Sequence, residues 1–558
     1  MTITRQRLAG VAGIAAFAVA LTACTSAPAD GTEDNGGAPT IAAEQSVGAM
    51  EDFEAGTTFK ATEPVEFSLM YRDHPGYPVK DDWSVLQHLD ADHNVTFART
   101  DIPMSDFEQK KSLLIGSGEA TDIISVSYSG SETKFVSGGA LLPVSDYLDY
   151  MPNFQEKVSE WDLQDELDNR RQADGKIYLL PGLRETPNVE YSIAVREDLW
   201  EKAGITEDPE TWEEFAEQLA KVQEANPEVS YAMSDRWTDS TPLGSLLNVM
   251  APNYGTAAGW QYNNTWYDED SEKYVFTGIT DEYRELISDV AGLVADGVLD
   301  PEITQSDDQA IQKFVSGESA AISSNTQTLA EYRTKLADAG QTDAKIRLIS
   351  IPAGPAGSNL PNGRFTSGLM IGSDAAEKPY FKALLQFIDW LYYSDEGIEF
   401  AQWGVEGETF TKDADGTRTL NPDINWSAVN AGAPKKLNAD FGYSNGVFLP
   451  ANGSSKELLL SLMTDEVAAW TEKQLESKTQ LPVAPAPLLD EIELEQTSLL
   501  QTQLTDAVHA STAAFITGQR SIDTDADWEA YVAEIEGLGS TQLIDTINTA
   551  LERTKNEK

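Results

Sequence analysis

The sequence has little cysteine, histidine or positive charge. Cys24 is the one cysteine among 558 residues, so no intramolecular disulfide can form. The four histidines lack the close spacing of a metal-binding motif such as H-E-x-x-H. Lys and Arg number 39 against 92 Asp and Glu, a formal net charge of -53. Such a charge repels phosphates, so it argues against binding to nucleic acid or to anionic lipid surfaces, and it disfavours a polyanionic ligand.

Long apolar runs are also scarce, and the one that stands out lies at the start of the chain. Arg5 and Arg7 precede an uncharged apolar run over residues 8–21. This pattern predicts a secretory signal over residues 1–23, because the run is too short for a comfortable membrane span. The run closes with Leu-Thr-Ala-Cys, which resembles a bacterial lipobox, in which the cysteine is lipidated. We therefore expect Cys24 to carry a lipid that anchors the protein at the extracytoplasmic face of the cell membrane. An ordinary cleavable signal followed by an incidental cysteine is the alternative.

Composition changes after the signal. Residues 24–62 are dominated by Ala, Gly, Pro, Ser, Thr and acids, with few side chains that could bury apolar surface. This composition predicts a flexible tether.

From residue 63 onward, strand and helix patterns alternate. Residues 65–71 and 123–127 have the pattern of strands, and a helix with a capping box starts between them at Ser105. A second unit begins with the strand 191–195. Such alternation predicts an α/β fold, in which ligands lie beyond the carboxyl ends of the strands. Arg72, Asp73 and Tyr128 follow the first two strands and are candidates for a cleft edge.

Several motifs resemble those of a known family, in family order. They are Asp174–Pro181, Pro209–Phe215, Phe314–Ile322, Gly363–Gly368 and Ser394–Gly397. Together they resemble bacterial extracellular solute-binding proteins of the sugar-binding class, maltose-binding-protein-like receptors of ABC importers. Residues 404–408 further resemble the branch that includes lipoproteins binding oligosaccharides.

The resemblance implies a two-lobed periplasmic-binding-protein-like fold of type II, with the ligand cleft between hinge-linked lobes and extra C-terminal helices. Lobe 1 would comprise residues 63–187 and 361–400, and lobe 2 residues 188–360 and 401–558. The implied function is not enzymatic. A monomer without a cofactor would capture a carbohydrate, expected to be an oligosaccharide, and deliver it to an ABC transporter permease.

The sequence does not support a metal site. Some members of the branch bind calcium in a loop that here reads Glu-Ala-Asn-Pro-Glu over residues 224–228, without alternating oxygen ligands. Asp523, Asp525, Asp527 and Glu534 have the offsets of an EF-hand loop, but Trp528 stands where that loop needs glycine. An acidic N-terminus of a helix explains these residues better.

A sugar site needs aromatic rings that stack on C–H faces, together with polar groups that bind hydroxyls. Trp237 and Trp260 lie in turn-rich stretches, and Trp403 with Glu406 forms another candidate pair. Each tryptophan alone is about as well explained by packing. Two polar candidates follow predicted strands: Asn325 and Arg364.

Two other functions stay open. The same cleft could bind a peptide or another polar solute. A secreted hydrolase is the rival class, because Gly442–Gly446 matches the nucleophile-elbow pattern around Ser444. The elbow needs a helix after the serine, and the following Val-Phe-Leu-Pro is not a helix start.

Overall fold

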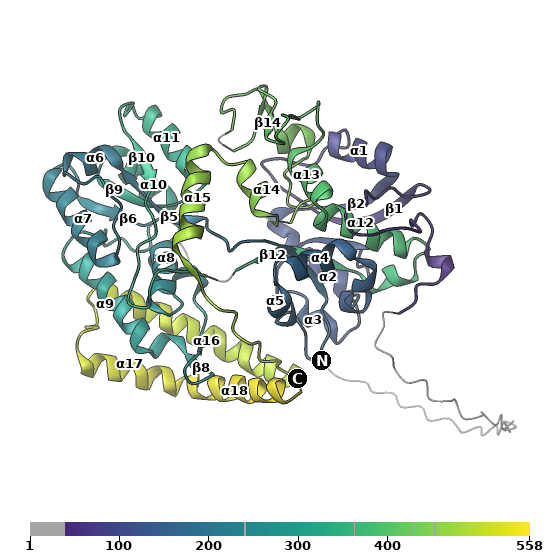
Figure 1. Ribbon diagram of the computed structural model, residues 1–558. Coiled ribbons are helices and arrows are strands. Elements are labelled where there is room, and N and C mark those ends of the chain that lie inside the picture. The colour runs from purple at the N-terminus through teal and green to yellow at the C-terminus, as the bar shows by residue number, and fades with distance from the viewer. Residues whose placement is uncertain (1–38, 239–240, 362, 428, 451–452, 558) are drawn as a thin grey trace, which may run out of the picture. The chain divides into compact units, whose positions relative to one another are not determined.

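Two mixed β-sheets organise the computed structural model (Figure 1). The structure describes residues 39–238, 241–361, 363–427, 429–450 and 453–557. The predicted signal and Cys24 lie outside these residues. Within the described ranges, no helix combines the length and the apolar character that crossing a membrane requires.

The first sheet has the strand order β2-β1-β3-β12-β4. β1 pairs in parallel with β2 and β3, whereas β12 runs antiparallel to both β3 and β4. The strands are β1 (Val65–Asp73), β2 (Val95–Pro103), β3 (Ile123–Ser127), β4 (Leu179–Leu183) and β12 (Phe365–Ile371). The helices of this lobe include α1 (Ser84–His93), α2 (Phe107–Gly116), α3 (Thr133–Val136), α4 (Pro152–Glu160), α5 (Gln164–Asp168), α12 (Phe381–Tyr393), α13 (Asp395–Trp403) and α14 (Lys456–Ser461). Twelve of the thirteen residues of α12 are buried, so this helix forms the centre of the first core.

The second sheet has the order β10-β5-β9-β6. β5 runs antiparallel to β9 and β10, and β6 is parallel to β9. The strands are β5 (Tyr191–Arg196), β6 (Tyr231–Ser234), β9 (Ser319–Asn325) and β10 (Ile346–Leu348), and a hairpin is formed by β7 (Thr265–Asp268) and β8 (Lys273–Phe276). The helices are α6 (Glu197–Lys202), α7 (Trp212–Ala225), α8 (Gly244–Tyr254), α9 (Asp281–Ala295), α10 (Asp307–Ser316) and α11 (Thr328–Asp338). α7 begins where the sequence predicts, because the Thr211 hydroxyl accepts a hydrogen bond from the Glu214 N–H.

The C-terminal helices pack on the second core, as the family resemblance implies. They are α15 (Asp465–Ser477), α16 (Glu491–Ile516), α17 (Asp525–Gly537) and α18 (Ser540–Glu557). Phe515 of α16 contacts Trp528 and Tyr531 of α17 through ring pairs with centroids 6.0 and 5.4 Å apart. Trp528, which interrupts the EF-hand spacing, is therefore a core residue.

Small β-pairs and short elements complete the fold. They are β11 (Asn359–Leu360) with β17 (Thr479–Gln480), β13 (Phe410–Lys412) with β14 (Arg418–Leu420), and β15 (Ile424–Asn425) with β16 (Lys435–Lys436).

The chain passes between the two cores three times. Core membership changes between Leu183 and Val189, between Leu360 and Phe365, and after Leu462. The predicted position of the last crossing, near residue 401, is wrong. Residues 403–462 close the first core, because their apolar side chains pack there and not on the second sheet.

The predicted tether also differs from the structure, over its second half. Phe59 is fully buried and Ala61 nearly so in the first core. The Gln386 side chain of α12 accepts a hydrogen bond from the Met50 N–H and donates one to the Met50 carbonyl. Residues 39–62 are therefore part of the first lobe, because a few apolar side chains suffice to bind this segment.

Candidate ligand-binding site

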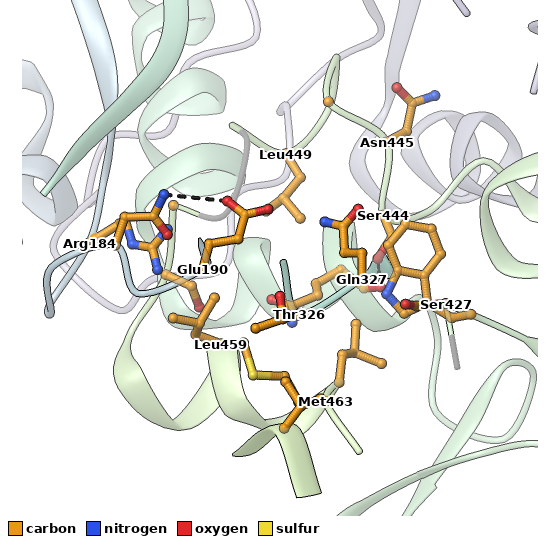
Figure 2. Close-up of a pocket in the computed structure, with 18 of the residues that line it drawn as sticks. Arg184, Glu190, Thr326, Gln327, Ser427, Ser444, Asn445, Leu449, Leu459 and Met463 are labelled. Atoms are coloured by element: carbon orange, nitrogen blue, oxygen red, sulfur yellow. Dashed lines mark hydrogen bonds between the residues drawn. The ribbon is translucent and has the colours of Figure 1, made fainter. Parts of the chain in front are cut away.

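A cavity of about 470 Å³ is lined by residues of the first and the last crossing. The first lobe contributes Arg72, near the end of β1, and Tyr77 from the loop that follows, and the second contributes Thr326 and Gln327 from the turn after β9. The first crossing contributes Arg184, Asn188 and Glu190. The segment before the last crossing contributes Gln402, Trp426, Ser427, Ser444, Asn445, Leu459, Leu462 and Met463 (Figure 2). The position at the carboxyl ends of β1 and β9 matches the expectation for ligands in α/β sheets.

Charged groups line the cavity at the first crossing. The Arg184 Nη1 donates to the Asn188 Oδ1 at 3.0 Å, and the Asn188 Nδ2 donates to the Glu190 Oε2 at 3.4 Å. Burial lowers the pKa of Arg184 to about 10 and raises the pKa of Glu190. The Arg184 Nε has no hydrogen-bond partner. In Figure 2, Arg184 and Glu190 lie on one side of the cavity, and Ser427 and Ser444 lie on the other. A polar ligand would meet strong hydrogen-bonding groups here, because little water screens them.

Neutral polar groups form the opposite wall. The Ser444 Oγ donates to the Gln402 carbonyl at 2.7 Å, and the Asn445 Nδ2 donates to the Tyr71 hydroxyl at 2.7 Å. Trp426, half-buried, is the tryptophan of this lining. Ser444 has a left-handed φ of 49°, as a nucleophile elbow would, but no helix follows it directly and no histidine is among the described lining residues. The arrangement lacks a base for a serine nucleophile.

Three aromatic rings form a cluster at the same edge of the second sheet. Tyr191, the first residue of β5, pairs with Asn325, the last residue of β9. The Tyr191 ring contacts Trp237 and Trp260 edge to face, with centroids 5.9 and 5.1 Å apart, and the two tryptophans are 5.8 Å apart. All three side chains are half-buried. The contacts between the rings fix their orientation, and part of each half-buried ring stays accessible to a ligand. The cluster therefore brings together two of the tryptophans that the sequence singles out.

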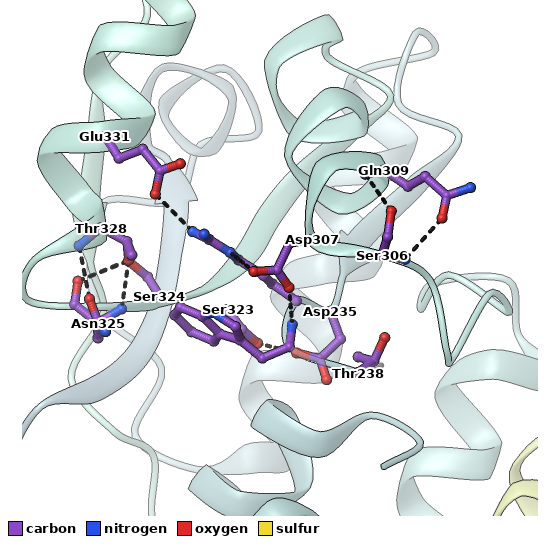
Figure 3. Close-up of polar contacts among 12 residues, drawn as sticks. Asp235, Thr238, Ser306, Asp307, Gln309, Ser323, Ser324, Asn325, Thr328 and Glu331 are labelled. Atoms are coloured by element: carbon purple, nitrogen blue, oxygen red, sulfur yellow. Dashed lines mark hydrogen bonds and ion pairs between the residues drawn. The ribbon is translucent and has the colours of Figure 1, made fainter. Parts of the chain in front are cut away.

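The neighbouring polar residues hold Trp237 in place (Figure 3). Its backbone N–H donates to the Asp307 Oδ1 at 3.0 Å, and the Arg236 guanidinium lies 4.7 Å from the ring centroid. Arg236 is itself paired with Asp307 and Glu331, at 3.1 and 3.0 Å. This network fixes the indole before any ligand arrives, which is the preorganisation that binding sites use.

Trp260 depends on a close approach of backbones. It lies in the short 3₁₀ segment Gly259–Gln261, where Gly259 has a φ of 66°. A Cβ at Gly259 would lie 2.2 Å from the Gly244 carbonyl oxygen of α8. Only glycine lets this segment reach α8 and place the indole beside Tyr191.

Asn325 acts on the site through the backbone. Its Oδ1 accepts hydrogen bonds from the N–H groups of Gln327 and Thr328, at 3.0 and 2.8 Å (Figure 3). It shapes the turn that presents Gln327 to the cavity. Of the first-lobe candidates, Arg72 lines the cavity and donates to the Tyr128 hydroxyl at 3.4 Å. Asp73 instead fixes the loop, because its Oδ1 accepts from the Val79 N–H at 2.8 Å.

Arg72 is the one sequence candidate in the described lining, so the rings of Trp237 and Trp260 stand outside it, and three further candidates are held by other contacts. Trp403 is 2% exposed in the first core, where its Nε1 donates to the Ser461 Oγ. Glu406 is exposed and is not in the lining. Arg364 forms an ion pair with Glu166 and donates to two backbone carbonyls, so its partners are all structural.

Sequence reasoning missed three lining residues with strong chemistry: Arg184, Glu190 and Gln327. The first two flank the hinge that was expected near residue 187, so proximity to the hinge was the available signal. Gln327 carries no such signal, because its neighbours in the cavity come from distant parts of the chain.

A second cavity of about 830 Å³ lies beside the β7–β8 hairpin. Its lining includes Trp266 and Tyr267 of the hairpin, the end of α8, and residues 481, 482 and 484. None of the candidates selected from the sequence lines it.

The family model of bacterial extracellular solute-binding proteins matches residues 79–397, more than half of the chain. The chain belongs to this family. It is a non-catalytic solute-binding protein of an ABC transporter, and the hydrolase alternative is wrong. Among curated proteins, none matches the sequence.

Solved structures share the fold at low identity. An alginate-binding protein, AlgQ2, has a TM-score of 0.65 at 17% identity, over 89% of this chain and 99% of that one. An HMO-binding protein associated with an ABC transporter, from Bifidobacterium longum infantis, has a TM-score of 0.66 at 17% identity, over 88% and 98%. The FusA substrate-binding protein of S. pneumoniae, in complex with kestose, has a TM-score of 0.60 at 18% identity, over 88% and 100%. These likenesses support the two-lobed α/β fold with C-terminal helices.

Proposed function

We propose that this solute-binding protein captures an oligosaccharide and delivers it to the permease of its ABC transporter. The observation that carries the proposal is the cluster of Tyr191, Trp237 and Trp260 at the sheet edge that also borders the polar cavity. Sugars combine C–H faces that stack on such rings with hydroxyls that bond to amides, hydroxyls and charged groups. The oligosaccharides named for several structural neighbours agree with this ligand class.

Capture would work by a shift between conformations. The chain crosses between the cores in three segments, and such hinges permit closure of the lobes around a ligand. A ligand that contacts both walls of the cavity binds the closed arrangement more tightly and therefore populates it. The permease would recognise that arrangement. A lipid on Cys24 would keep the receptor near the permease, and labelling with a radioactive fatty acid, lost in Cys24→Ser, tests this part.

A thermal-shift screen of residues 39–558 against mono- and oligosaccharides tests the ligand class. A ligand at 100 times its Kd adds about 2.7 kcal/mol to the free energy of unfolding. We expect a shift with one saccharide series, and about a tenfold or greater loss of affinity in Trp237→Ala and Trp260→Ala.

Trp266→Ala is the matched control, because this half-buried tryptophan of the same lobe borders the second cavity. Loss of binding in Trp266→Ala alone would refute the site. A shift with peptides and with no saccharide would refute the ligand class.

A further inference from the structure

The arginines of this acidic protein divide into two groups. The described residues contain fourteen arginines, and eleven of them have a carboxylate oxygen within 4.0 Å. With 92 acids in the chain, a nearby carboxylate is the ordinary condition of an arginine here. The other three form the exception: Arg72, Arg170 and Arg184.

Each exceptional arginine donates to a neutral oxygen. Arg72 donates to the Tyr128 hydroxyl at 3.4 Å, and Arg184 donates to the Asn188 side-chain oxygen at 3.0 Å. Arg170 donates to the hydroxyl of Ser129, the residue next to Tyr128. Arg72 and Arg184 line the cavity itself, and Arg170 is linked to it through the loop after β3. Two of the three arginines without an acidic partner therefore line one cavity, and the third bonds to the loop that Arg72 also contacts.

Their hydrogen-bonding capacity is also incomplete. Arg184 is 3% exposed, yet its Nε has no partner, and the buried Nε of Arg170 has none either. A buried guanidinium without a counterion raises the free energy of the folded protein, and binding of an anion lowers it again. Planar guanidinium groups fit carboxylates through two parallel hydrogen bonds.

The nearby carboxylates do not take this role. Glu190 is the one carboxylate among the described lining residues; it stands more than 4.0 Å from the Arg184 nitrogens and accepts a hydrogen bond from Asn188. Glu132 and Glu166 attract Arg170 but also lie beyond 4.0 Å. The overall charge of -53 does not oppose a local anion site, because salt screens exposed charges beyond about 8 Å.

We propose that the captured saccharide is acidic, and that Arg72 and Arg184 bind its carboxylate groups. This inference rests on the proposed function, since it names the class of oligosaccharide for the same site. It revises the expectation from composition that a polyanionic ligand is disfavoured.

Matched pairs of ligands test the inference. The probes are oligogalacturonides and oligomannuronates of two to six sugars, each compared with its carboxyl-reduced form, which keeps the linkages and ring stereochemistry. We expect calorimetry to give at least about tenfold tighter binding of an acidic form than of its reduced form. Affinity for the acidic form should also fall as NaCl rises from about 0.02 to 0.5 M.

Variants assign the effect to residues. Arg72→Gln and Arg184→Gln should each weaken the acidic ligand about tenfold and leave the reduced form within about twofold. Arg171→Gln is the control, because Arg171 adjoins Arg170 but is paired with Asp168 at 2.9 Å, and it should leave both affinities unchanged.

The outcomes separate this inference from the proposed function. Two outcomes would refute the acidic ligand: equal binding of the reduced and acidic forms, or binding of neutral saccharides alone. If that binding depends on Trp237, the saccharide receptor stands. Equal weakening of both forms in Arg72→Gln and Arg184→Gln also refutes it. If no saccharide binds and a peptide does, both proposals fail.

Discussion

Trp403 offers the sharpest test of the distinction between core and site. The sequence makes it a candidate ring for stacking, whereas the structure places it in the first core at 2% exposure. Its ring centroid lies 5.5 Å from that of Phe410, and its Nε1 donates to the Ser461 Oγ at 3.1 Å. These contacts hold residues 403–462 against the rest of the lobe. Trp403→Ala should therefore change stability, with ligand contacts unaffected.

The magnitude follows from the buried ring. Replacing a fully buried tryptophan with alanine removes about 3 to 5 kcal/mol through lost burial and the cavity left behind. For a unit of this size, 1 kcal/mol moves the melting temperature by about 2 to 4 °C, so the first lobe should melt roughly 10 °C earlier. Calorimetry measures the melting temperature, and that of Trp403→Phe should lie between those of the alanine variant and the parent.

Saccharide binding is measured on the same variant at a temperature where it stays folded. Affinity should remain within about threefold of the parent, because no lining residue is changed. An unchanged melting temperature together with more than tenfold weaker binding would refute the core assignment and return Trp403 to the site.

Three further predictions concern stability. Arg364→Leu should lower the free energy of unfolding by about 3 to 5 kcal/mol in urea titrations, because it leaves Glu166 buried without its partner, and a loss below 1 kcal/mol would contradict the buried pair. A chain that begins at Glu63 should melt below one that begins at residue 39, since it lacks the buried Phe59 ring; equal melting temperatures would show that the segment is dispensable. Burial alone would lower the pKa of His88, but its hydrogen bonds to two carboxylates outweigh burial and raise that pKa, so His88 contributes stability below its unfolded pKa of about 6.5 and loses this contribution as pH rises through the folded pKa. His88→Gln should therefore destabilise the protein at pH 5.5 more than at pH 9, and equal effects at both pH values would refute the ion pairs.

Sequence patterns predict the parts of this fold that depend on local chemistry. The cap at Thr211 starts α7, and Trp212 on its apolar face is buried. β1 and β9 belong to different sheets but end at the same cavity, which is why Arg72 lines it and Asn325 shapes the turn beside it.

The remaining parts depend on contacts between distant segments. Trp237 and Trp403 both occur near turns, and only packing decides that the first supports Tyr191 while the second enters the core. The packing of residues 403–462 on the first lobe likewise depends on contacts with distant segments of the chain. That no carboxylate pairs with the Arg184 guanidinium can be recognised only when all of its neighbours in space are known.

The position of β12 in the first sheet has a consequence for how the chain folds as it is made. Among the described strands, β4 pairs with β12 alone, and β3 needs β12 on one side, yet about 190 residues separate β4 from the end of β12. At 5 to 20 residues per second, roughly 10 to 40 s pass before that strand emerges. During this interval two sheet edges stand open, and open edges invite pairing with other chains. The nascent first lobe should therefore depend on holding chaperones, whereas the second sheet, complete at Leu348, can form before it.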